Sequence, residues 1–257
     1  MKDLIKLEFR KLKRQKSFYI ILAIMLVMVI ISALTYKFLE NLTAEMNEIG
    51  EAFGETFSAT GESVLLGFLS SANFSLLAAI FVAIVVCDDY GSGIVKNIFS
   101  RGYSRADFYF AKLIYLLCTT TVMFVSSFTV AGISGALLFG FSGDVNKTVV
   151  LISTQYLACV ATVTMYYAIC SAIKKLGASI AAGIIAPSVV SLVLSLADTA
   201  INSEKFKIND YFITSFTTTL SNISVETSRI IVCAALSVVY AALFIVLGFE
   251  SCKRVEV

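Results

Sequence analysis

The chain contains no histidine, and only one proline, Pro187, among its 257 residues. Without histidine it cannot form the Ser-His or Cys-His pairs of many hydrolases or bind metals through imidazole. The sequence also contains no GxxxxGK(S/T) phosphate-binding loop, no HExxH pattern and no EF-hand loop. If ATP drives this protein, a second polypeptide must therefore bind the nucleotide.

Charged residues are scarce as well, at 15% of the chain, whereas 58% of the residues are hydrophobic and the mean hydropathy is +0.87. A helix needs about 20 mostly apolar residues to cross the hydrocarbon core of a bilayer. Stretches that satisfy this requirement occur at 18–38, 64–86, 113–139, 148–173, 177–197 and 229–249. The pattern predicts an all-α, polytopic membrane protein with six transmembrane helices in a single domain, residues 1–257.

Lysine and arginine are distributed unequally between the two sides that six spans define. The side of the termini holds 15 of these 20 residues, and the other side holds 5. Cytoplasmic segments of membrane proteins carry such an excess. We therefore expect a multi-pass protein of the cell membrane with cytoplasmic N- and C-termini. Orientation and anionic lipid headgroups explain the basic residues, so we expect contact with membrane lipid and not with nucleic acid.

Three segments outside the spans have patterns of their own. In residues 1–17, Leu4, Ile5, Phe9 and Leu12 recur at helical spacing among basic residues, which predicts an interfacial elbow helix with its apolar face in the lipid. A purely topogenic basic tail is the alternative. External segments are expected at 40–63, where the pattern is an amphipathic helix weakened by glycines, and at 201–228.

The external segment at 201–228 is too polar to span the membrane and too apolar for a free loop, which predicts short helices buried against the protein. The spans themselves contain many serine and threonine residues. Such hydroxyl groups usually satisfy neighbouring backbone or allow close helix packing, and a polar pathway is the alternative reading. Pro187 in the fifth span is similarly compatible with a packing kink or with a hinge for gating.

A charged, glycine-punctuated segment, residues 88–112, joins the second and third spans. Gly91 and Gly93 allow the backbone to turn before the sequence IVKNIF, which can form one or two helical turns. We expect a short helix that offers the apolar side chains of Ile94, Ile98 and Phe99 within a ring of charges. A few anchored apolar groups with a polar rim are typical of protein interfaces, so the segment predicts a docking surface for a cytoplasmic partner.

This segment resembles the cytoplasmic loop of ABC-2 type transporter permeases. In that family an acidic residue precedes a Gly-Thr pair, a leucine- and serine-containing stretch, a Ser-Arg pair and a lysine at the start of the third span. The aspartates at 88 and 89, Gly93, the pair Ser104-Arg105 and Lys112 match this pattern, and Ile94 stands where the family often has threonine. The six spans, the cytoplasmic termini and the amphipathic start agree with the resemblance over nearly the whole chain.

The resemblance implies a type V exporter-like permease fold that works as a pair of permease chains, here a homodimer, with two copies of a separate ATP-binding subunit. Residues 88–100 would form the coupling helix. No cofactor is expected on this chain, because ATP and magnesium would bind the partner. The residues implied in coupling to the ATPase are Asp88, Asp89, Tyr90, Gly91, Gly93, Ile94, Lys96, Asn97, Ile98, Phe99, Arg101 and Arg105.

The chain is also similar in size to permeases of bacitracin resistance, lantibiotic immunity and phenol-soluble modulin export. No aromatic platform for stacking sugars is evident, which favours an amphipathic or antimicrobial-type peptide, or another amphipathic cargo, over polysaccharide. A stand-alone ion-coupled carrier is the alternative function, but it would need ionisable groups in the middle of the membrane, where these spans have almost none. An enzymatic role is not expected.

Overall fold

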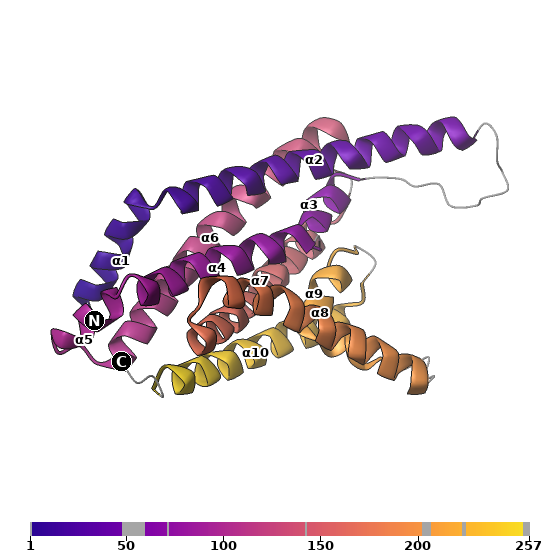
Figure 1. Cartoon of the computed structure of the whole chain (residues 1–257). Coiled ribbons are helices and arrows are strands. Elements are labelled where there is room, and N and C mark those ends of the chain that lie inside the picture. Colours follow the sequence, from indigo (N-terminus) through magenta and orange to yellow (C-terminus); the bar gives the residue numbers. More distant parts are fainter. Residues whose placement is uncertain are drawn as a thin grey trace.

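In the computed structural model, the described residues are 2–47, 60–70, 72–141, 143–201, 207–222 and 225–253, and they form helices and connections without a strand. Figure 1 shows the helices arranged as an elongated bundle. In chain order the elements are α1 (Lys2–Arg14), α2 (Lys16–Asn47), α3 (Gly61–Ser70), α4 (Ala72–Gly91), α5 (Ile94–Ser100), α6 (Arg105–Leu138), α7 (Val145–Ile173), α8 (Leu176–Ile201), the 3-10 helix η1 (Ile208–Tyr211), α9 (Ile213–Thr219) and α10 (Thr227–Lys253).

Six helices of the described chain are long and apolar enough to cross a membrane, namely α2, α4, α6, α7, α8 and α10. This finding confirms the predicted all-α membrane protein with six spans. The short helices expected between the fifth and sixth spans are present as η1 and α9, and Ile213, Phe216 and Leu220 are buried there.

The second predicted span, 64–86, is described as α3 up to Ser70 and as α4 from Ala72, and residue 71 between them lies outside the described part of the chain. α3 is held at its start by the end of α6, because the backbone N–H of Gly61 donates to the carbonyl oxygen of Gly140 over 3.0 Å.

Two other segments differ from their predicted extent. α2 continues to Asn47, so residues 40–47, expected in an external segment, belong to the first long helix, while residues 48–59 lie outside the described part of the chain. α6 begins at Arg105, so the last eight residues of the predicted 88–112 loop are helical.

The N-terminal helix α1 packs against protein with the face that was expected to lie in lipid. Leu4 is buried among residues of α5 and α6, and Leu12 packs on the main core. Leu7 and Phe9 remain exposed, at 39% and 36%. The predicted helix is present, but the prediction of a lipid-facing apolar side is wrong for Leu4 and Leu12, because α6 offers that side a matching protein surface.

α7 occupies the centre of the bundle and contacts α4, α6, α8 and α10. Its most apolar stretch is 67% buried, against 28% for α2, 17% for α10 and 11% for α8. α2, α8 and α10 thus expose long apolar faces that suit contact with lipid. In Figure 1, α1, α5 and the last turn of α10 lie at one end of the bundle, which we call the terminal end.

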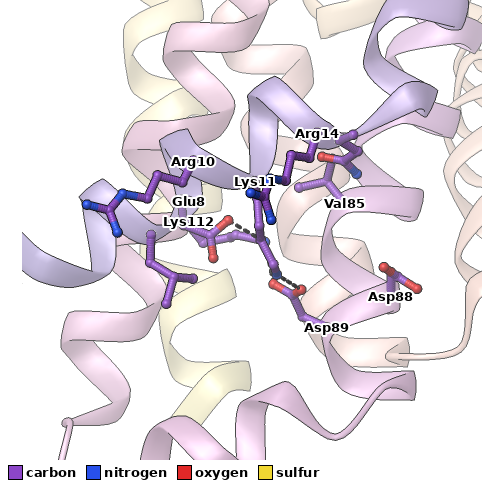
Figure 2. A pocket seen from close by; sticks show the side chains of 10 residues that line it. Glu8, Arg10, Lys11, Arg14, Val85, Asp88, Asp89 and Lys112 are labelled. Atoms are coloured by element: carbon purple, nitrogen blue, oxygen red, sulfur yellow. Dashed lines mark hydrogen bonds and ion pairs between the residues drawn. The ribbon is translucent and has the colours of Figure 1, made fainter.

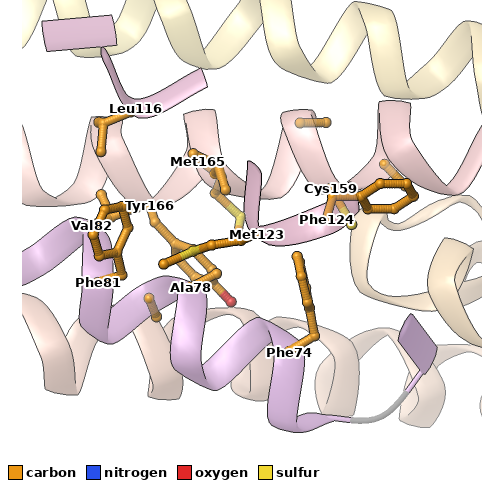
Figure 3. Packing of buried hydrophobic residues seen from close by; sticks show 14 of the residues in the cluster. Phe74, Ala78, Phe81, Val82, Leu116, Met123, Phe124, Cys159, Met165 and Tyr166 are labelled. Carbon is orange, nitrogen blue, oxygen red and sulfur yellow. The ribbon is translucent and has the colours of Figure 1, made fainter. Parts of the chain in front are cut away.

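Tyrosines tie three helices together near the terminal end. Tyr109 of α6 and Tyr167 of α7 stack with ring centroids 4.7 Å apart. The hydroxyl of Tyr167 donates to the carbonyl oxygen of Tyr109 over 3.1 Å, and the hydroxyl of Tyr109 donates to the carbonyl oxygen of Ile245 in α10 over 3.0 Å. Farther along the bundle, close packing of Phe74, Met123 and Tyr166 fills the space between α4, α6 and α7 (Figure 3).

The buried side chain of Gln155 in α7 forms hydrogen bonds to two other segments of the chain. Its side-chain N–H groups donate to the carbonyl oxygens of Leu66 in α3 and Leu220 after α9, over 3.1 and 3.2 Å. Polar contacts of this kind fix the packing of helices in a membrane. Gln155 therefore links α7 to α3 and to the segment after α9.

The packing of α10 on α6 and α7 predicts that Gly248→Ala destabilises the protein. A Cβ at residue 248 would lie 2.5 Å from the hydroxyl oxygen of Tyr109 and 3.2 Å from the Cα of Ala168. Overpacking of this kind costs about 1–3 kcal/mol. The measurement is the free energy of unfolding of the purified protein in detergent, followed by circular dichroism.

Gly177→Ala is the matched control, because nothing lies within 4 Å of a Cβ at that position of α8. Alanine is favoured over glycine in a helix by up to about 1 kcal/mol, so the control should be neutral or stabilising. Equal stability of the two variants would contradict the close approach at Gly248.

Candidate functional site: the α5 region and its ion-pair cluster

The predicted coupling segment consists of the short helix α5 with one turn before it and one turn after it. α4 carries Asp88, Asp89 and Tyr90 in its last turn and ends at Gly91. Gly93 follows with a φ of 71°, and Gly102 after α5 has a φ of 84°, a left-handed conformation that only glycine adopts easily. The helix expected from the sequence IVKNIF is therefore confirmed, and both of its ends depend on a glycine.

α6 begins directly after this turn because Ser104 caps its first turn. The backbone N–H of Asp107 donates to the Ser104 hydroxyl oxygen over 3.0 Å, and the hydroxyl donates to a carboxylate oxygen of Asp107 over 2.8 Å. An N-terminal serine with an acidic residue three positions later satisfies helix N–H groups that have no partner within the helix. The Ser-Arg pair of the sequence motif thus marks the start of α6.

One side of α5 is buried against its own chain. Val95 and Ile98, at 3% and 6% exposure, pack with Leu4 of α1 and Phe108 of α6, and Ile94 packs at the edge of this group. The expectation that Ile98 offers an apolar contact outward is wrong. The IVKNIF sequence makes an amphipathic turn, and its apolar side is used to attach α5 to the bundle.

Aromatic rings extend this attachment. Tyr90 and Phe99 each meet the ring of Phe108 edge-on, at centroid distances of 6.3 and 5.9 Å. The guanidinium group of Arg105 lies 6.0 Å from the ring of Phe99 and donates to the carbonyl oxygen of Lys253 at the end of α10. Arg105 therefore connects the α5 region with the last helix.

Behind α5, four charged residues from three helices form an ion-pair cluster: Glu8 and Lys11 of α1, Asp89 of α4, and Lys112 of α6. The Nζ of Lys112 donates to a carboxylate oxygen of Glu8 over 3.0 Å and to one of Asp89, and Lys11 donates to the other oxygen of Asp89 (Figure 2). The side chains of Asp89 and Lys112 are 2% exposed, and that of Glu8 is 5% exposed. The cluster contains two acids and two bases, so its formal charges balance.

The buried position of the cluster corrects the prediction for Asp89 and adds two residues that the sequence did not point out. Asp89 lies inside the bundle and is not part of an outward-facing charged surface, because the two lysines draw its carboxylate inward. Glu8 and Lys11 were not predicted as site residues. A signal for Glu8 exists in the sequence, since it lies four residues after Leu4 and four before Leu12 and so shares their helix face.

The outer side of the α5 region is exposed and polar. Its exposed side chains come from Asp88, Lys96, Asn97, Arg101 and Arg105. Beside it, a cavity of about 700 Å³ lies along α1 and the end of α4, and its walls include the ion-pair cluster together with Arg10, Arg14 and Asp88 (Figure 2). Within the described residues, no three Cys, Asp or Glu side chains are grouped as metal ligands. The arrangement is that of an anchored helix with a free basic face.

Comparison with known protein families gives a match over most of the chain. Residues 4–198 match the family described as ABC-2 family transporter protein. The matched region contains the ion-pair cluster, α5 and the first five long helices. Among curated proteins, none matches this chain.

Lys112→Met should destabilise the protein by about 3 kcal/mol or more, because it leaves the buried carboxylate of Glu8 without its cation and Asp89 with only Lys11. Adding Glu8→Gln to this variant should restore part of the loss. The measurement is the free energy of unfolding in detergent.

Lys37→Met is the control, because its pair with Glu40, at 2.7 Å, has side chains that are 39% and 32% exposed. Exposed pairs contribute at most about 1 kcal/mol. If Lys112→Met is no more harmful than Lys37→Met, the cluster does not stabilise the fold.

Proposed function

Because the chain belongs to the ABC-2 family of transporter proteins and is the permease subunit of an ABC transporter, we propose that the outer face of α5 is the surface on which a separate ATP-hydrolysing subunit docks. The observation that carries the proposal is the two-sided character of α5. Its apolar side is fixed to α1 and α6, whereas Lys96, Asn97 and Arg101 on the other side are exposed.

The inner contacts of α5 supply a route by which a push on this helix would move the transmembrane bundle. Ile98 contacts Leu4 and Phe108 within one buried group, and Arg105 holds the end of α10. The ion-pair cluster fixes α1, α4 and α6 to one another at the same level. Force applied at α5 would therefore reach α1, α4, α6 and α10 as one unit and would not simply bend a loop.

The chemistry of the exposed face defines what the partner must offer. Lys96 and Arg101 are basic, and Asn97 between them carries both a donor and an acceptor. A complementary groove on the ATP-binding subunit would provide carboxylates beside an apolar rim for the partly exposed Ile94 and Phe99. ATP and magnesium would bind that subunit, in keeping with the lack of a phosphate-binding loop in this sequence.

The complete transporter that this proposal describes has two copies of this chain and two ATP-binding subunits. It exports amphipathic cargo, with antimicrobial-type peptides as the preferred class, and its terminal end faces the cytoplasm. The support is the likeness of the 88–112 segment to exporter permeases and the excess of lysine and arginine at the terminal end.

A stand-alone ion-coupled carrier is the competing function. Such a carrier would place ionisable groups near the middle of the bilayer. Three buried charged residues of the described chain lie near helix ends, namely Glu62 at the start of α3, Asp89 in the last turn of α4 and Lys112 in the third turn of α6. The fourth, Glu8, lies in α1, which is not one of the six long apolar helices. Their positions favour a structural role, and ATP dependence of transport separates the two functions.

Reversing the charge of the exposed face should uncouple the subunits. We expect Lys96→Glu with Arg101→Glu to reduce co-purification of a partner carrying a GxxxxGK(S/T) loop, and ATP-dependent transport in proteoliposomes, at least tenfold. Repulsion between like charges across an interface costs several kcal/mol. The change should leave unfolding stability unaltered, because neither side chain is buried.

Lys175→Glu serves as a control for charge reversal of an exposed lysine, since Lys175 lies between α7 and α8 and is not part of the α5 segment. A double variant that retains partner binding and transport at normal abundance would refute α5 as the docking surface.

The orientation is tested by cysteine accessibility. Cys118 is the exposed cysteine among the six, so Cys118→Ser gives a suitable background. In it, Lys96→Cys should react with a membrane-impermeant maleimide only after the cells are permeabilised, whereas Val145→Cys, at a residue 72% exposed at the opposite end, should react in intact cells. The reverse pattern would show that the terminal end faces outward.

A further inference from the structure

A second cavity, of about 530 Å³, lies between α4, α7, α8 and α9, toward the end of the bundle opposite α5. Its volume is within the range of sites for small organic ligands, about 300–1,000 Å³. Apolar walls come from Phe74, Leu76, Ile184, Leu192 and Ile213. Figure 3 shows Phe74 and Tyr166 projecting from facing helices at the inner side of this region.

The polar part of the wall consists of hydroxyl groups. Nine of the sixteen lining residues are serine, threonine or tyrosine, and none of the sixteen is acidic or basic. A charged ligand would lose its hydration without gaining a counter-charge, which is costly in an apolar environment. The walls therefore select a neutral molecule.

Most of these hydroxyl groups already donate a hydrogen bond within the protein. Ser188 and Thr217 donate to carbonyl oxygens of their own helices over 2.8 and 3.1 Å, and Ser191 donates to the side-chain oxygen of Asn209 over 3.1 Å. Further donors of this kind are Thr162, Ser195 and Thr218. A hydroxyl oxygen that donates its proton still offers lone pairs. The wall is thus rich in hydrogen-bond acceptors and poor in donors.

One hydroxyl group of the lining residues makes no hydrogen bond within the described chain. It is the buried hydroxyl of Thr214 in α9. Buried polar groups normally have partners, from protein, water or ligand. A hydroxyl group can both donate and accept, so Thr214 points to a bound molecule that carries a polar group.

We infer that this cavity binds a neutral amphiphile, with its hydroxyl or amide donors on the serine and threonine oxygens and its apolar chain along Phe74, Leu192 and Ile213. The monoacylglycerol class has this chemistry. The inference concerns binding by one permease chain and does not depend on the docking of an ATPase at α5.

The test uses the full chain in phosphatidylcholine nanodiscs without a partner. A monoacylglycerol with a diazirine in its acyl chain is photolysed, and the labelled peptides are identified by mass spectrometry. We expect saturable labelling in residues 74–76 and 213–218 that unlabelled monoacylglycerol competes away. The same probe with both hydroxyl groups methylated should label these residues at least fivefold less.

Variants test the acceptor role directly. Ser188→Ala with Thr217→Val removes two acceptors and should reduce saturable labelling at least fivefold. Ser153→Ala with Thr129→Val is the matched control, because these exposed hydroxyl groups also donate to carbonyl oxygens of their own helices but do not line the cavity. Equal labelling by the two probes, or equal labelling of the two double variants, would overturn the inference, since it would show apolar partitioning alone.

Discussion

The buried charge of Lys112 is the constraint on which the terminal end of this structure depends. An ammonium group in an apolar interior is tolerated only when it is paired and hydrogen-bonded. Here Glu8 and Asp89 supply carboxylates to Lys112, and Lys11 supplies the second cation. These residues come from three helices, so satisfying the charges requires α1, the end of α4 and the start of α6 to meet in one place.

That meeting determines how α5 is displayed. Once α1 and α6 are joined behind it, Leu4 and Phe108 form a fixed apolar surface on which Val95 and Ile98 pack. α5 is only seven residues long and is bounded by turns at Gly93 and Gly102. Its apolar residues face the bundle, so the surface that remains is polar. A helix this short would not be stable in isolation. Its defined position is a property of the cluster and the packing beneath it.

Several features of the fold follow from local sequence and were predictable. The six apolar stretches, the short helix in IVKNIF and the helices between the fifth and sixth spans depend on composition and spacing within a few turns. The pairing of Lys112 with Glu8 joins residues 104 positions apart, and no local pattern contains that information. For the same reason the sequence indicated a helix at 94–99 but not which face of it would be buried.

The placement of α3 illustrates another limit. Hydropathy marks 64–86 as an apolar stretch, but it does not say which parts of the chain the residues of α3 contact. α3 is positioned by contacts from elsewhere in the chain, since Gly61 bonds to Gly140 and Gln155 bonds to the carbonyl group of Leu66. In a membrane, where apolar contact with lipid and with protein is equally favourable, such polar and close-packed contacts decide the arrangement.

The two ends of the bundle use polar groups in opposite ways. At the terminal end, the charges of the cluster are paired with one another and their number is balanced, so the cluster holds helices together. Toward the other end, hydroxyl groups are satisfied one by one within their own helices and keep acceptor lone pairs free along a cavity. α4 and α7 run between these regions. α4 carries Asp89 of the cluster near one end and Phe74 of the cavity wall near the other, so one helix contributes to both kinds of polar environment.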